Sequence, residues 1–227
     1  MRAARALAYL VALLILGSAS VAIAQSTAQP RRWDGETAVR VYGVGTFGAG
    51  GDVNAQGAGI HTRAGVMPSG GAAIGVEVPL AHAFSIGVEG NVWIWGTQRS
   101  ASMDVSDSYL LELSAVPRFR CPWSSASGEQ HFALGFAFPV GPTLSFLHSG
   151  DQTNTLSSIG TRDGRGLGLH VGALAEAEVF LIRNVGLLLD VGYIHHIVWH
   201  DPITPGDRDL QIDFGQLVVR LGVVIAL

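Results

Sequence analysis

Alternation of apolar and polar residues with a period of two is the feature that most constrains how this chain folds. Successive side chains of a β-strand point to opposite faces, so residues two apart share a face. In 166–180 one face carries His170, Glu176 and Glu178, and the other carries seven apolar residues: Leu167, Leu169, Val171, Ala173, Ala175, Ala177 and Val179. The pattern recurs in 83–95 and 210–227. It predicts strands with one apolar and one polar face.

The connections between such stretches differ systematically in length. We predict eight strands, at 37–48, 70–79, 83–95, 108–120, 131–147, 166–180, 185–199 and 210–227. The links after the second and sixth strands are tight, and the link after the fourth, 121–130, is moderate. The other links are longer and polar: 49–69, 96–107, 148–165 and 200–209. Short turns at one end and long loops at the other are typical of outer-membrane barrels. The sequence therefore predicts an all-β fold, an eight-stranded antiparallel up-and-down transmembrane β-barrel.

Composition narrows the function classes. Only 14% of the residues are charged, whereas soluble domains average about 25%. The formal net charge is −4, all 14 basic residues are Arg, and no basic cluster occurs, which argues against binding to nucleic acid. No uninterrupted apolar stretch reaches 18 residues, so no transmembrane helix is predicted. Alternation alone would also fit a soluble β-sandwich; the sorted loop lengths favour the barrel.

The first residues have the order of a secretory signal. Arg2 and Arg5 precede an apolar run over 6–16, and small residues follow up to Ala24. This arrangement predicts a signal peptide over 1–24, followed by a polar leader over 25–36 and the barrel domain over 37–227. The run is shorter than the ~20 residues of a spanning helix, so an N-terminal membrane anchor is the less favoured alternative. The expected location is the cell outer membrane.

Aromatic residues fall near the predicted strand ends, where membrane barrels carry two aromatic girdles. Those expected at the loop side are Phe47, Trp93, Trp95, Tyr109, Phe146, Trp199 and Phe214. Those expected at the turn side are Trp33, Phe119, Trp123, Phe132 and Phe180.

Two motifs resemble the family of small eight-stranded outer-membrane barrels, typified by the transmembrane domain of outer-membrane protein A. The first runs from Leu111-Glu112-Leu113 through Pro117, and continues in Phe138-Pro139-Val140-Gly141-Pro142-Thr143-Leu144. The second is similar to the recognition signal for the outer-membrane barrel assembly machinery, and its residues are Arg220, Gly222, Ile225 and Leu227. Leu227 stands where that signal usually has an aromatic residue. The resemblance, which covers 37–227, implies insertion by that machinery and contact with outer-membrane lipids, including lipopolysaccharide.

Charged residues on the polar faces are expected inside the barrel. They are Arg40, Glu77, Glu89, Glu112, Arg118, Glu176, Glu178, Asp190 and Arg220. Neighbouring strands should pair Arg40 with Glu77 and Asp190 with Arg220. Eight strands enclose an interior just wide enough for side chains, so we favour a structural salt-bridge network over a proton or small-ion path. The six acids outnumber the three bases, which suggests that some carboxylates are protonated, hydrated or directed elsewhere.

Catalytic and metal sites are weakly supported. His148, Ser149 and Asp151 are close in sequence, but adjacent residues of an extended chain point apart. His195 and His196 face opposite ways on a strand, and His200 lies four residues beyond His196, roughly 13 Å at ~3.3 Å per residue. Cys121 is expected to be a small apolar residue rather than a reactive thiol. We therefore expect no enzyme activity, no metal and no cofactor.

The expected role is structural or surface-interactive, with an extracellular ligand bound at the long loops. The alternatives are a narrow porin-like channel for small solutes or ions, a lipid-modifying membrane enzyme, and a soluble periplasmic β-sandwich or lipocalin-like binder.

Overall fold

The computed structural model describes residues 37–47, 52–57, 60–65, 68–81, 83–96, 108–124, 130–147, 161–182, 184–202 and 209–227. The predicted signal peptide and leader lie outside these residues, as do His148, Ser149 and Asp151. No helix in the described part of the chain is long and apolar enough to cross a membrane.

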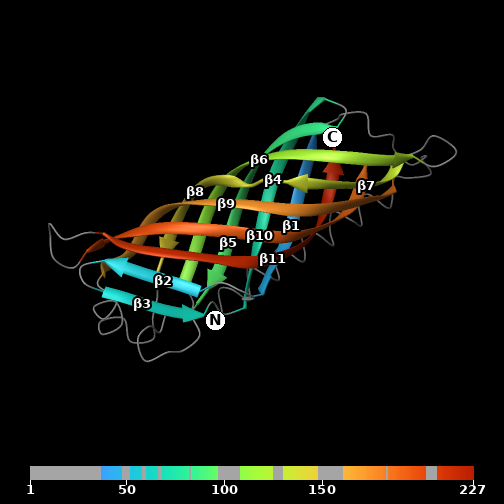
Figure 1. Ribbon diagram of the computed structural model, residues 1–227. Helices are drawn as coiled ribbons and strands as arrows, with labels where there is room; N and C mark the ends of the chain where they lie inside the picture. Colours follow the sequence, from blue (N-terminus) through green and yellow to red (C-terminus); the bar gives the residue numbers. More distant parts are fainter. Residues whose placement is uncertain are drawn as a thin grey trace, which may run out of the picture.

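Eight strand lines close into a single antiparallel ring (Figure 1). They are β1 (Ala38–Phe47), β4 (Ser69–Ala81), β5 (Phe84–Trp95), β6 (Ser108–Ser124), β7 (Gln130–Ala137) with β8 (Val140–Phe146), β9 (Thr161–Ile182), β10 (Val185–Pro202) and β11 (Leu210–Ala226). The blue β1 and red β11 close the ring, from Ala38 opposite Ala226 to Phe47 opposite Leu217. The predicted fold class is confirmed.

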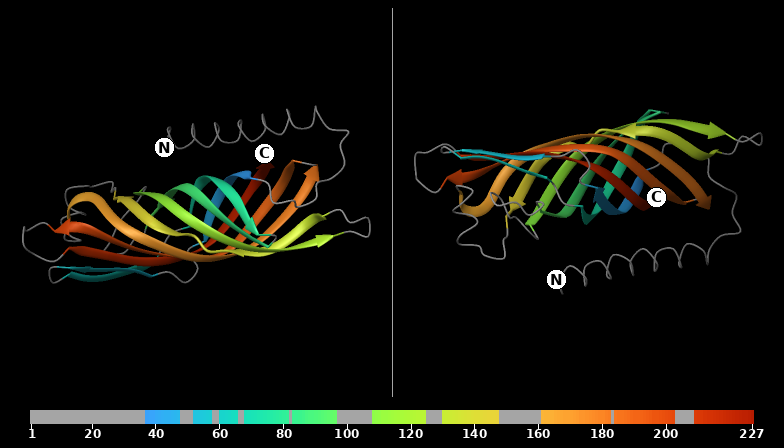
Figure 2. Two further views of the ribbon diagram at one scale, coloured as in Figure 1. Left: turned by 90° about the horizontal axis from the view of Figure 1, so that it is seen from above. Right: turned by 60° about the horizontal axis from the view of Figure 1, so that its bottom comes forward.

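The strands wind obliquely around the barrel axis (Figure 2). The shear of the barrel can be read from the residue pairs. A path that starts at Ile212 on β11 and steps from each residue to its partner on the next strand returns to β11 at Gly222, ten residues further on, so the shear number is ten. The path runs through Ile212, Val198, Gly168, Thr143, Glu112, Asn91, Ala73, Tyr42 and Gly222. With a rise of ~3.3 Å per residue and a strand spacing of ~4.8 Å, this shear tilts the strands by about 40°. Residues far apart in sequence therefore reach the same height inside the barrel.

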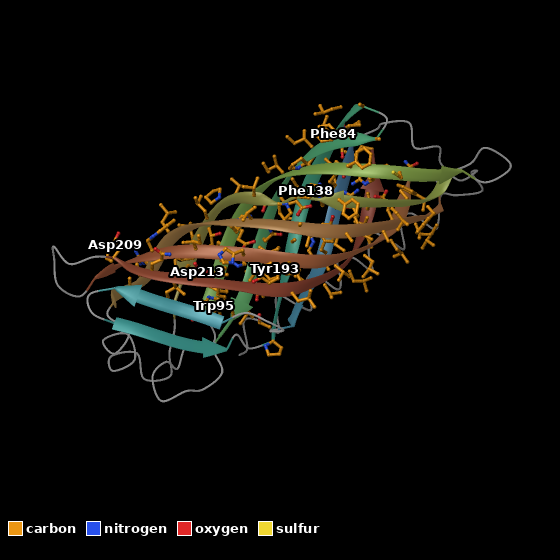
Figure 3. All side chains as sticks on the ribbon, in the orientation of Figure 1. Phe84, Trp95, Phe138, Tyr193, Asp209 and Asp213 are labelled. Carbon is orange, nitrogen blue, oxygen red and sulfur yellow. The ribbon has the colours of Figure 1, made fainter. Side chains whose placement is uncertain are left out.

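The outer face of the ring is apolar and the inner face holds the charges. Figure 3 shows Phe84 and Phe138 on the wall, where they are 41% and 45% exposed. Apolar side chains also face outward along β9, from Leu167 to Val171, and at Leu221 on β11. The predicted interior charges are all at most 5% exposed. This is the inverse of a soluble barrel, whose apolar face would point inward.

The predicted loop 49–69 contains two strands, β2 (Asp52–Gly57) and β3 (Ile60–Gly65). The β2–β3 hairpin pairs with β11 over Gln211–Asp213, beyond the point where β1 ends opposite Leu217. The hairpin thus covers a strand edge that β1 leaves open, and an uncovered edge is a site of unwanted pairing. Similarly, β9 begins at Thr161 and β10 continues to Pro202, inside the predicted loops, because these polar ends pair with each other.

The predicted strand 131–147 is interrupted at Phe138 and Pro139, between β7 and β8. Proline has no N–H to donate to a ladder. The register nevertheless continues, since Ala137 lies opposite Leu174 and Val140 opposite Val171. Gly172 N donates to Pro139 O at 2.8 Å, which keeps the two halves on one line.

Four of the predicted girdle aromatics lie inside instead. Trp93, Trp95 and Phe214 are at most 1% exposed, and Phe180 is 8% exposed. The girdle prediction was wrong for them because it used their distance from the strand ends and ignored parity. Trp93 and Trp95 share the face of Glu89, which points inward. Tyr109, Phe119 and Trp199 are exposed on the outside, whereas the side chains of Phe47, Trp33 and Trp123 lie outside the described residues.

Ring closure can be tested by cross-linking β1 to β11. Gly43 lies opposite Leu221, at the ~4.5–5.5 Å Cα separation that a disulfide spans. In a Cys121→Ser background, the pair Gly43→Cys and Leu221→Cys should oxidise and shift the boiled, non-reduced gel band. The control pair Gly43→Cys and Ile225→Cys is four residues out of register and should not. Equal cross-linking of both pairs would contradict the register.

Candidate functional site

The turn end of the interior is filled by nine charged side chains, which we call the salt-bridge plug: Arg40, Glu77, Glu89, Arg118, Arg120, Glu176, Glu178, Asp190 and Arg220. They come from β1, β4, β5, β6, β9, β10 and β11, so every strand line except β7–β8 contributes. None is more than 3% exposed. Each lies inward because it shares the polar face of its strand.

Arg40 is the centre of the plug. Its Nε donates to Glu77, its Nη1 to Glu176 at 3.2 Å, and its Nη2 to Glu178 at 2.7 Å. The predicted pair of Arg40 and Glu77 is therefore formed. Because the strands are tilted, Arg40 also binds two acids of β9, which is not a neighbour of β1. Arg120 donates to the same set, from Nη2 to Glu77 at 2.8 Å and from Nε to Glu176 at 2.6 Å.

Arg220 forms the second predicted pair. Its Nε and Nη2 both donate to Asp190 Oδ2, at 2.9 and 2.6 Å, and its Nη1 donates to Glu89 Oε2 at 2.8 Å. The guanidinium carbon also lies 4.3 Å from the centre of the Tyr42 ring, a cation–π contact. Arg118 links the two halves of the plug, because it donates to both Glu89 and Glu176.

Two inward glycines make room for these side chains. A Cβ on Gly87 would lie 2.5 Å from Arg118 Nη1, and a Cβ on Gly75 would lie 2.5 Å from Glu89 Cγ. A larger residue at position 75 would press on Cγ of Glu89, which binds Arg118 and Arg220. At position 87 it would press on the end of the flexible Arg118 side chain, so glycine leaves space for the plug at both positions.

Arg120 was missed by the sequence analysis. Arg120 is the last residue of the predicted strand 108–120 and is absent from the predicted interior charges, whereas β6 continues to Ser124. Arg120 shares the parity of Glu112 and Arg118, which was the available signal. The tally of three interior bases was therefore wrong, and four arginines face inward among the described residues.

Glu112 does not join the plug. It lies in a separate group nearer the loop end, which we call the histidine cluster: Asn91, Trp93, Glu112, Ser114, Thr143, His170 and His196. Trp93 Nε1 donates to Glu112 Oε2 at 2.7 Å, and His196 Nε2 lies 2.6 Å from Oε1. The hydrogen-bond partners of Glu112 thus include a tryptophan and a histidine, whereas those of the plug acids include arginines.

Aromatic rings close the histidine cluster toward the loop end. Trp95 stacks on Phe214 with ring centres 4.6 Å apart, and Phe214 stacks on His196 at 4.8 Å. On three strands that carry both groups, a buried apolar side chain separates the cluster from the plug: Val116 on β6, Leu174 on β9 and Ile194 on β10. On β5, polar Asn91 lies between Glu89 and Trp93. The interior is therefore filled along its length rather than hollow.

The other candidate residues are not brought together. His195 points outward, where its Nε2 lies 3.1 Å from Asp213 Oδ1, while His196 and His200 are buried inside. No group of three or more His, Cys, Asp or Glu side chains in the described segments is placed to hold a metal ion. Cys121 is an exposed residue of β6. His170 lies 2.8 Å from Ser114 Oγ, but its other nitrogen faces Thr143, so no acid completes a triad.

The residues of the predicted assembly signal all lie on β11 or directly after it. Arg220 and Gly222 are buried, Ile225 is half-buried, and Leu227 is 68% exposed. Arg220 and Gly222 of the predicted signal thus face inward, and the apolar Ile225 and Leu227 face outward.

An apolar outer wall around an ion-paired interior is the arrangement of a membrane-spanning β-barrel. The chain has the fold of the small eight-stranded outer-membrane barrels. Among solved structures it is similar to the outer membrane protein OprG from Pseudomonas aeruginosa, with 11% identity and a TM-score of 0.55 over 85% of this chain and 96% of that one.

Two further similar structures have lower scores. Neisserial surface protein A is 11% identical over 84% of this chain and 97% of its own, with a TM-score of 0.47. Ail, the attachment invasion locus protein of Yersinia pestis, is 13% identical over 84% and 99%, with a TM-score of 0.42. No family model and no curated protein sequence matches the chain.

Removing Arg220 should destabilise the barrel. The Arg220→Leu variant leaves Glu89 and Asp190 without this cation, and stranding buried partners costs about 3–5 kcal/mol. The urea midpoint of the folded barrel should fall accordingly. Arg220→Lys keeps the charge but loses the forked geometry and should lie between parent and Leu variant. An unchanged midpoint in Arg220→Leu would show that the plug is not what stabilises the interior.

Proposed function

We propose that the chain is an integral outer-membrane protein with a structural or surface-interaction role, in which a sealed barrel anchors and displays the segments at its loop end. The observation that carries this proposal is the pairing of an apolar outer wall with a plug of mutually bonded charges. Outward apolar side chains of this kind are favourable against lipid, and the bonds among the interior charges support a structural role for them. The role is non-catalytic in this proposal.

A narrow channel is the competing function. The plug crosses the interior through bonds from Arg40 and Arg118 on one side to Glu176 on the other. Opening a path would break several buried ion pairs at once, and each break costs several kcal/mol. The filled interior therefore supports the anchor over the channel.

The partners we propose follow from the two ends of the barrel. Outer-membrane lipids, including lipopolysaccharide, contact the wall, and the barrel assembly machinery inserts the chain through the β11 signal. An extracellular ligand binds at the loop end, where β2, β3 and the extended ends of β9 and β10 project beyond the point at which β1 ends (Figure 1).

Location and conductance together test this role. The protein should be recovered in the outer-membrane fraction, and unboiled samples should run at a different apparent size from boiled ones, because folded barrels resist SDS. In planar bilayers the purified barrel should show no steady ion conductance, since the plug fills its interior. Recovery as a soluble periplasmic protein would overturn the membrane assignment, and steady conductance would favour the channel.

The lipid contact of the wall is tested by one outward substitution. Val191 faces outward in the middle of β10, opposite Val219 and Ala175. Val191→Arg should lower the free energy of unfolding in lipid vesicles by about 2–4 kcal/mol, the cost of arginine on the lipid face near the midplane. The control Asp209→Arg, at the exposed loop end beside β11, should cost at most ~1 kcal/mol. Equal costs would argue against burial of the wall in lipid.

A further inference from the structure

The salt-bridge plug contains one more acid than base. Its cations are Arg40, Arg118, Arg120 and Arg220, and its acids are Glu77, Glu89, Glu176, Glu178 and Asp190. With every group ionised, the plug would hold a net charge of −1 among side chains that are at most 3% exposed. An uncompensated buried charge is so costly that the group takes up a proton instead. One bound cation or proton would therefore make the plug electrically neutral.

The hydrogen bonds show where the compensation is missing. Both carboxylate oxygens of Glu77, Glu89 and Glu176 accept hydrogen bonds from arginine. Glu178 Oε1 and Asp190 Oδ1 are different, because each is buried and has no hydrogen-bond partner among the described residues. The two residues lie on the neighbouring strands β9 and β10, on the inward face, and are diagonal to each other, since Glu178 pairs with Leu188 and Asp190 with Glu176.

Glu178 is the less well compensated of the two. Asp190 receives two N–H groups from Arg220, and within the described part of the chain Glu89 is the one other acid that Arg220 binds. Glu178 receives Arg40 Nη2 at 2.7 Å and lies 3.5 Å from Arg120 Nε, and both arginines also bind Glu77 and Glu176. The charged groups around Glu178 from every contributing strand are Arg40, Glu77, Glu89, Arg118, Arg120, Glu176, Asp190 and Arg220.

We propose that the plug binds one proton and holds it on Glu178, whose side chain is a neutral carboxylic acid in the folded barrel. The proton sits on Oε1, the oxygen without a partner, and Oε2 continues to accept from Arg40. Asp190 Oδ1, on the adjacent strand, also has no hydrogen-bond partner among the described residues. The plug is then electrically neutral. This proton site goes beyond the anchoring role and stands on the geometry of the plug alone.

A bound proton makes stability depend on pH with a definite sign. An exposed glutamate is ionised at neutral pH, so the unfolded chain has released the proton that the folded barrel keeps. The folded state therefore binds more protons, and its resistance to unfolding falls as pH rises through the range in which Glu178 ionises. An ordinary ion-paired carboxylate gives the opposite slope, with stability lost toward low pH.

The matched variants Glu178→Gln and Glu176→Gln test the proposal on the full chain folded in detergent micelles. Glutamine resembles a neutral carboxylic acid, so Glu178→Gln should keep the parent urea midpoint at pH 7 and should lose its decline at alkaline pH. Glu176→Gln, two residues away on the same face, removes a carboxylate that three arginines bind and should lower the midpoint or prevent folding. Failure of Glu178→Gln to fold, or a loss as large as that of Glu176→Gln, would overturn the proposal.

Infrared spectroscopy supplies a second measurement that reports the proton itself. The parent barrel should show the carbonyl stretch of a protonated carboxyl, shifted in D₂O, and Glu178→Gln should lack it. Persistence of the band in Glu178→Gln with its loss in Asp190→Asn would assign the proton to Asp190 and overturn the placement. Absence of the band from the parent, with a urea midpoint that rises with sodium concentration, would replace the proton by a metal cation.

Discussion

The ion pairs inside the ring are the interaction on which the rest of the structure depends. A barrel that faces lipid has to place its polar side chains inward, and there every charge must find its partner among side chains from the other strands. Glycines at 75 and 87 leave space for this network, and the plug in turn holds seven of the eight strand lines together. The apolar wall and the charged plug thus have the same origin: compared with a soluble barrel, the apolar side chains face outward and the charged ones face inward.

Strand parity made much of this arrangement accessible from the sequence. A period of two assigns each residue to a face without any knowledge of the fold, which is why the predicted interior charges are buried. Adjacency in the chain also predicted that Arg40 lies beside Glu77 and Asp190 beside Arg220, because β1 pairs with β4 and β10 pairs with β11. The predictions failed where position along a strand was used in place of parity, as with Trp93 and Trp95 inside the loop end.

Contacts across the ring could not be predicted in the same way. They depend on the shear, which is a property of the closed wall and leaves no local mark in the sequence. Arg40 meets Glu178 from a position 138 residues away, and His196 meets Glu112 from 84 residues away. The β2–β3 hairpin was hidden for another reason: it borders the wall over three residue pairs, and its polar residues lack the apolar alternation that marks a lipid-facing strand.

The long sequence separations within the plug have a kinetic consequence. Bringing together residues more than 130 positions apart requires closing a very large loop of chain, so these pairs form only when most strands are already in place. Interactions that form after the rate-limiting step hardly change how fast a protein folds and mainly slow its unfolding. The plug therefore forms late in folding. It slows the unfolding of the finished barrel, whereas the early steps of folding depend on the hairpins between consecutive strands.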